Sequence, residues 1–121
     1  MQIELKNLDT VEGALTVKGP QVEVTLGDAG QANVTIALSL SDGTHFFYPD
    51  GSGKVLNATT TLPPGDYDCV VVVNAMHLDV FGTTYRSKVT IGGITVATAQ
   101  GSVAAGQKSE QDFQIFRLIV R

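Results

Sequence analysis

The sequence predicts an all-β fold, an antiparallel sandwich of seven to nine short strands, in a single domain that spans residues 1–121. Two observations support this. Apolar and polar residues alternate with a period of two in most segments, and glycine-rich turns interrupt the alternation about every ten residues. No segment keeps a helical period for three turns. Many short strands at this spacing are typical of two antiparallel sheets packed face to face.

In the first half of the chain, the expected strands have apolar residues at every second position. The clearest of them is residues 34–40, where Val34, Ile36, Leu38 and Leu40 alternate with small or polar residues. The turn sequences GDAG, SDGT and DGSG separate the segments, because glycine supplies positive φ and Asp bonds its own backbone. The other strand-like segments of this half are residues 3–5, 15–17, 22–26 and 54–62.

In the second half, a run of valines after Tyr67 predicts a strand that continues to about Asn74. Further strands are expected at residues 76–81, 84–91 and 94–99, and Gly92 and Gly93 form the turn between the last two. A small-residue loop, GSVAAGQ, then leads into a final strand within residues 109–121.

The stretch LPPGDYDCVVVV places Tyr67 two residues before Cys69 and two residues after a Pro-Pro-Gly corner. In immunoglobulin-like sandwiches, a tyrosine in this position covers the edge of the core, and its hydroxyl bonds backbone upstream. A disulfide partner of Cys69 would be expected on the strand 34–40, which contains only aliphatic, small and hydroxyl residues. Cys69 is the only cysteine of the chain, so we expect a small, buried, apolar side chain there.

Two segments resemble a known group of modules. DGSGKVLNATTTLPPGDYDCVVVV is similar to a segment of bacterial immunoglobulin-like, carboxypeptidase-regulatory-like and transthyretin-like β-sandwich modules, and VAAGQKSEQDFQI resembles their closing hairpin. The resemblance covers roughly residues 32–116. It implies an immunoglobulin-like sandwich with an accessory or structural role, in an extracellular, cell-surface or virion setting.

Composition argues against several kinds of partner. The chain has a formal net charge of −4, and its eight Lys and Arg residues are scattered. Nucleic-acid binding is not expected, because neutralising phosphates requires clustered cations. No apolar run is long enough for membrane insertion, and residues 1–9 do not have the basic and apolar segments of a secretory signal.

No catalytic or cofactor motif is present. The sequence contains neither a nucleophile elbow nor a phosphate-binding glycine loop. His45 and His77 lie in different segments without a neighbouring cysteine, whereas zinc needs at least three ligands. We therefore expect neither an enzyme nor a bound metal or cofactor.

The aromatic run HFFYP permits two interpretations. Alternation places one of Phe46 and Phe47 in the core and the other outside. An outward ring, together with His45 and Tyr48, would give a surface on which a sugar ring could stack. Carbohydrate binding through His45, Phe47 and Tyr48 is the alternative functional hypothesis.

The C-terminal strand, FQIFRLIVR, has apolar residues on both faces. Sandwich strands normally bury one face and expose the other, and a bulge would correct the phase only in part. Since an apolar outer face is usually covered by another chain, we expect Phe116, Leu118, Ile119 and Val120 to contact a protein partner or a second copy. The sequence therefore favours a non-enzymatic structural or assembly module that acts through protein–protein contacts.

Overall fold

The computed structural model describes residues 2–27, 34–48, 55–76, 83–103 and 109–121. Strands make up most of these residues, and the described ranges include no helix that could cross a membrane. The strands are β1 (Gln2–Leu5), β2 (Ala14–Val17), β3 (Gln21–Leu26), β4 (Val34–Leu40), β5 (His45–Tyr48), β6 (Leu56–Thr61), β7 (Gly65–Met76), β8 (Thr83–Ile91), β9 (Ile94–Val103) and β10 (Ser109–Val120).

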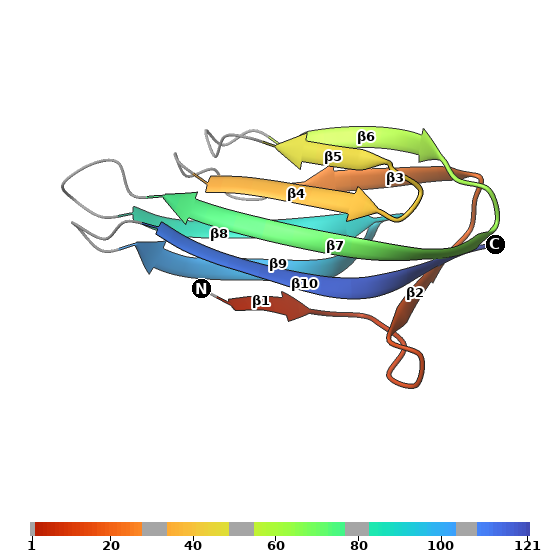
Figure 1. Cartoon of the computed structure of the whole chain (residues 1–121), viewed down its shortest axis with the longest axis horizontal. Coiled ribbons are helices and arrows are strands. Elements are labelled where there is room, and N and C mark those ends of the chain that lie inside the picture. Colours follow the sequence, from red (N-terminus) through yellow and green to blue (C-terminus); the bar gives the residue numbers. More distant parts are fainter. Residues whose placement is uncertain (1, 28–33, 49–54, 77–82, 104–108) are drawn as a thin grey trace.

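The strands form two five-stranded sheets that lie one in front of the other (Figure 1). The order in sheet A is β1-β9-β8-β3-β6, and the order in sheet B is β2-β10-β7-β4-β5. Every pair of neighbours is antiparallel except β10 and β2, which run parallel. The expected all-β class and the two-sheet arrangement are confirmed.

The described residues contain ten strands, so the expected number of seven to nine is too low. The segments 3–5 and 15–17 were expected and are β1 and β2, whereas β5, which has four residues, was not among the expected strands. β1 belongs to sheet A and β2 to sheet B, because the chain changes sheets between them. Of the strand expected at 76–81, only Met76 lies within the described residues, where it ends β7.

The core lies between the two sheets and is almost entirely aliphatic. Inward positions of β4 alternate strictly with half-buried outward ones, and Leu38 is fully buried. Leu26 of β3, Val71 of β7 and Ile91 of β8 are likewise fully buried. The turn expected between β8 and β9 is also confirmed, since Gly92 and Gly93 both have positive φ.

The Tyr67 corner has the expected geometry. The Tyr67 hydroxyl donates a hydrogen bond to the Pro63 carbonyl oxygen at 2.6 Å, and its ring packs against the core. Cys69 is fully buried. The strand 34–40 does not face Cys69 across the core, because β4 is the neighbour of β7 in the same sheet and Leu40 is directly beside Cys69.

The longest pairing in the molecule joins β7 to β10. Twelve consecutive pairs run from Gly65 opposite Val120 to Met76 opposite Ser109, with no shift in register. The bulge considered for the last strand is therefore absent. Without a bulge, successive side chains of β10 alternate between the two sides of sheet B along its whole length.

A side chain of the last strand also holds the first strand in place. The Asp112 carboxylate of β10 accepts a hydrogen bond at 2.6 Å from the backbone N–H of Ile3 in β1. Because β1 is an edge strand of sheet A and β10 belongs to sheet B, this bond connects the two layers.

We expect Tyr67→Phe to lower the free energy of unfolding by about 1 kcal/mol, the usual net contribution of one hydrogen bond. The substitution keeps the ring and removes only the bond to Pro63. Urea unfolding measures the change. A variant as stable as the native chain would contradict a stabilising role for this corner.

We expect Asp112→Ala to loosen β1, because the Ile3 amide then loses its acceptor. Loss of a hydrogen bond to a charged group costs about 1.5–3 kcal/mol, so exchange of the Ile3 amide with deuterium should accelerate at least about tenfold. Asp112→Asn keeps a side-chain carbonyl and should have a smaller effect. Equal exchange in all three proteins would show that the bond does not hold the strand.

Candidate functional site

The outer face of sheet A is polar. Its outward side chains pair across strands: the Gln21 amide donates to the Thr61 hydroxyl at 3.0 Å, and the Thr25 hydroxyl donates to the Asn57 carbonyl oxygen at 2.8 Å. On β1, the outward residues are Gln2 and Glu4. A sheet face of this kind is suited to contact with water.

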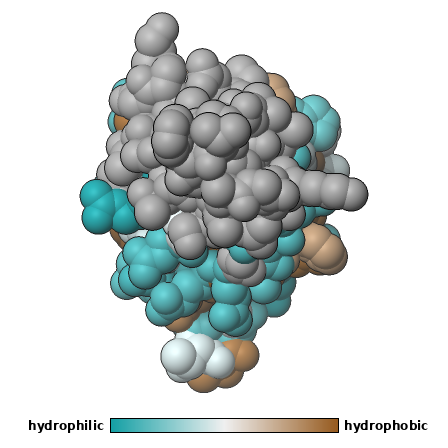
Figure 2. Space-filling view, turned by 90° about the vertical axis from the view of Figure 1, so that its left-hand side faces the viewer, coloured by the Kyte–Doolittle hydropathy of each residue, from teal (hydrophilic) through white to brown (hydrophobic). Residues whose placement is uncertain are grey.

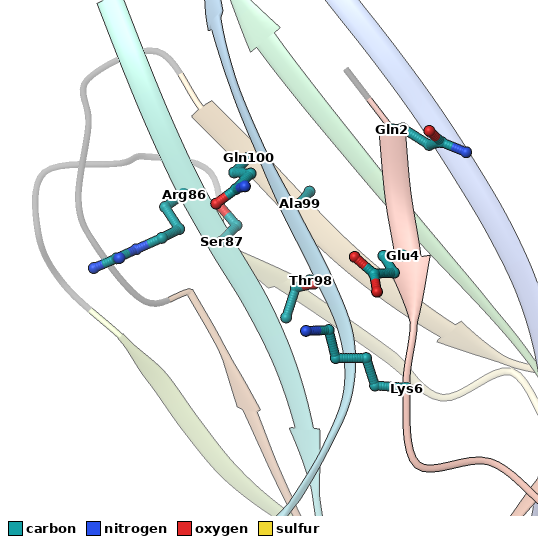
Figure 3. A pocket seen from close by; sticks show the side chains of 8 residues that line it. All are labelled: Gln2, Glu4, Lys6, Arg86, Ser87, Thr98, Ala99 and Gln100. Atoms are coloured by element: carbon teal, nitrogen blue, oxygen red, sulfur yellow. The ribbon is translucent and has the colours of Figure 1, made fainter.

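A shallow depression of about 260 Å3 lies on this face where β1, β9 and β8 meet. In Figure 3, Glu4 of β1 and Lys6, just after β1, reach towards Thr98 of β9, and Arg86 extends away from β8 on the other side. These groups can donate and accept hydrogen bonds, but no His or Cys accompanies them. The lining is Gln2, Glu4, Lys6, Arg86, Ser87, Thr98, Ala99 and Gln100.

The outer face of sheet B is apolar in its middle. Phe113 lies opposite Val72, Val72 is opposite Ala37, and Ala37 is opposite Phe47. Directly opposed residues point to the same side of a sheet. Together they form one continuous row across four strands, which we call the apolar row: Phe113, Val72, Ala37 and Phe47.

The next row of sheet B extends this surface. Ile115 lies opposite Val70, which is opposite Ser39, which in turn is opposite His45. We define the apolar patch as the apolar row together with Ile115 and Val70. Its three large protruding side chains, Phe113, Ile115 and Phe47, are 60%, 58% and 57% exposed.

Polar residues border the apolar patch on both sides. Gln111 and Asn74 lie opposite each other beyond the apolar row. On the other side, the Arg117 guanidinium and the Asp66 carboxylate form an ion pair at 3.0 Å. Figure 2 shows the molecule from the left-hand end of Figure 1. Hydrophilic residues lie below the centre, hydrophobic residues lie at the lowest tip, and hydrophobic residues also project at the right-hand border, the side that faces the reader in Figure 1.

Three of the four residues expected to contact a partner are not on the surface. Phe116, Leu118 and Val120 are at most 3% exposed, and they belong to the core. This corrects the prediction for those three, because the unbroken β7–β10 register turns them inward. Ile119 points outward and is half-buried.

The residues that the sequence analysis missed are Phe113 and Ile115, together with Val70 and Val72 of the neighbouring strand. Phe113 and Ile115 are apolar residues two apart that precede Phe116, so they are in the opposite phase to the buried residues of β10. That change of phase was the sequence signal that could have placed Phe113 and Ile115 on the outer face. A bulge after them, which the sequence analysis considered, would have turned both side chains inward.

The alternative ligand-binding residues are partly brought together. His45 and Phe47 are both exposed on the outer face of sheet B, and the His45 Nδ1 atom lies 2.9 Å from the Ser39 hydroxyl. Tyr48 is in β5, but its side chain lies outside the described residues. Phe46 is buried, so the expectation that one of the two phenylalanines faces the core is confirmed.

No group of three or more His, Cys, Asp or Glu residues within the described ranges could hold a metal ion. His77 lies outside those ranges. Burial raises the pKa of the Cys69 thiol from 9.0 to about 12, and the nearby Asp68 and Asp42 carboxylates act in the same direction. Since the thiolate is the reactive form, Cys69 has the properties of a structural residue.

Comparisons of this chain with protein-family models, with curated proteins and with solved structures gave no match.

We expect the Cys69 thiol of the folded chain to resist a disulfide reagent at pH 8 and to react fully once urea unfolds the protein. A Thr98→Cys variant adds a thiol on the outer face of sheet A and should react at once at that added position. Burial of this thiol also makes stability depend on pH, because the thiol of the unfolded chain ionises before that of the folded chain. Its effect on the free energy of unfolding is absent below pH 9, and the free energy decreases as the pH rises towards about 12. Cys69→Ala should lack that part of the decrease. Rapid modification of the native thiol would contradict its burial.

Proposed function

We propose that this chain is an immunoglobulin-like β-sandwich module with a non-enzymatic structural or assembly role, and that it acts through protein–protein contacts of the apolar patch. The observation that carries the proposal is the patch itself: two phenylalanine rings and an isoleucine, each more than half exposed, on β10 and β5 of one sheet, with apolar side chains of β7 and β4 between them. The bond from Tyr67 to Pro63 supports the immunoglobulin-like part.

The composition of the patch favours a protein partner. An apolar centre with a polar border is the usual anatomy of a protein interface, and aromatic residues are enriched in such centres. Covering apolar surface contributes about 25 cal/mol for each Å2 removed from water. A cell-surface appendage or a virion, the setting implied by the sequence resemblance, would supply such a partner.

Carbohydrate binding is the second candidate, and one observation favours it. His45 and Phe47 lie side by side on the face that also presents Phe113. Sugar recognition needs hydrogen-bonding groups around an aromatic platform. Val70, Val72 and Ala37 supply none between the two rings, so the protein contact is the better supported proposal.

We expect Phe113→Asp to release the chain from the complex that it forms in extracts of cells that produce its natural assembly. A charge in the middle of a buried apolar contact is left without a partner, which weakens binding strongly. Size-exclusion chromatography of native extracts, followed by detection of the chain, measures the release.

Val11→Asp is the matched control, because Val11 is an exposed apolar residue in the turn between β1 and β2, outside the patch. It should leave the elution of the complex unchanged. If both variants elute like the native chain, the patch is not the contact. Retention on polysaccharide that is lost in Phe47→Ala would instead establish the carbohydrate function.

A further inference from the structure

We propose that the occupant of the apolar patch is the same patch of a second copy of this chain, so that two molecules pack with their sheets B face to face. This inference rests on the proposed function, since it identifies the partner in the protein contact described above. Four features of the described residues support it, and they are the profile of the patch, its charge, its area and the nature of the opposite face.

The profile of the apolar row is nearly the same when read from either end. A protruding ring stands at each end, on β10 and on β5, and half-buried small side chains lie between them. A ring of one copy can therefore lie over the low middle of the other, with the reciprocal contact at the symmetry-related position. In a two-fold interface residue i meets j and residue j meets i, so one surface must supply both partners. A row that is high at its ends and low in its middle meets this requirement.

The charges of the chain do not oppose this contact. Two copies that each carry a net charge of −4 repel one another unless their charged groups lie away from the interface. None of the six residues of the apolar patch is charged. In the next row Asp68 lies directly opposite Arg117, and Asp66 beyond it forms an ion pair with the Arg117 guanidinium. The contact therefore buries no unpaired carboxylate at its centre.

The area of sheet B is that of a weak, concentration-dependent pair. The sheet has five strands, and β7 and β10 have 12 residues each. The other three strands are shorter, with seven residues in β4 and four in each of β2 and β5. With strands about 4.8 Å apart and a rise of about 3.3 Å per residue, the strands of sheet B present an outer face of roughly 600 Å2. A standard protein interface buries about 800 Å2 on each partner. Sheets also pack face to face readily, with their strands within about 30° of each other.

The pairing would leave only polar faces in contact with water. Sheet A presents hydrogen-bonded polar side chains such as Gln21, Thr25 and Asn57 on its outer face. In the proposed dimer, sheet A forms the outside of both molecules and sheet B is enclosed. The different polarity of the two faces follows directly from this arrangement.

Sedimentation velocity of the purified chain over a range of concentrations tests the proposal. We expect a concentration-dependent dimer, with dimerisation at least about tenfold weaker in Phe113→Asp and in Phe47→Ser, because residues at the centre of an interface dominate its affinity. Val11→Asp should dimerise like the native chain. Far-UV circular dichroism of each variant verifies that the fold is retained.

Cross-linking locates the contact. A Val72→Cys variant places a thiol in the middle of the apolar patch, and a short bifunctional maleimide should link two copies of it. Thr98→Cys places the thiol on the outer face of sheet A, and this variant should not be cross-linked into a covalent dimer. The native Cys69 is buried, so the unmodified chain provides the background.

The outcomes separate this inference from the proposed function. A chain that stays monomeric at several hundred micromolar, without a Val72→Cys cross-link, overturns self-pairing. If Phe113→Asp is nevertheless released from the complex in cell extracts, a different protein is the partner and the proposed function stands. If that variant also remains in the complex, both are wrong. A dimer that cross-links through Thr98→Cys alone assigns the contact to sheet A and overturns the inference.

Discussion

The pairing of β7 with β10 determines the character of both sides of sheet B. It runs over twelve consecutive residue pairs without a bulge, so each side chain of β10 faces the side opposite to its neighbours. Phe116, Leu118 and Val120 are held inward by their fit to the core. Phe113 and Ile115 must then point outward, although both are as apolar as the buried residues. The exposed patch is thus a consequence of register, and a shift by one residue would reverse it.

The two outer faces of the sandwich differ in polarity, because the outward side chains of their strands differ. Sheet A consists of strands whose outward residues are amides, hydroxyls and charges, and several of these bond across strands. Sheet B is built around β7, whose outward residues Val70 and Val72 are as apolar as its inward residues. A strand that is apolar on both sides is typical of a strand covered on both sides. Within the described residues, this chain covers only one of them.

The sequence was sufficient for most of the strands and for the Tyr67 corner, because period-two alternation and turn residues are local signals, but it did not give the short strand β5. It also predicted that one of Phe46 and Phe47 faces out. It could not predict the apolar patch, whose members come from β10, β7, β4 and β5, since their meeting depends on strand order and register. The partner-binding prediction failed at Phe116, Leu118 and Val120 for the same reason. Apolar residues on both sides of a strand do not reveal which side is buried.

The first half of β10 shows that its outward apolar residues are not a defect of packing. Glu110, Asp112 and Gln114 occupy the inward positions there and are half-buried, whereas Phe113 and Ile115 point outward. If only the hydrophobic effect mattered, a sandwich without a partner would be more stable with the apolar residues of this half-strand inward and the polar residues outward. Instead, the inward Asp112 bonds the backbone of Ile3 and links the sheets. The inward polar residues of this half-strand therefore have a structural role, and departures from the expected pattern of this kind are the reason the patch is proposed as a contact surface.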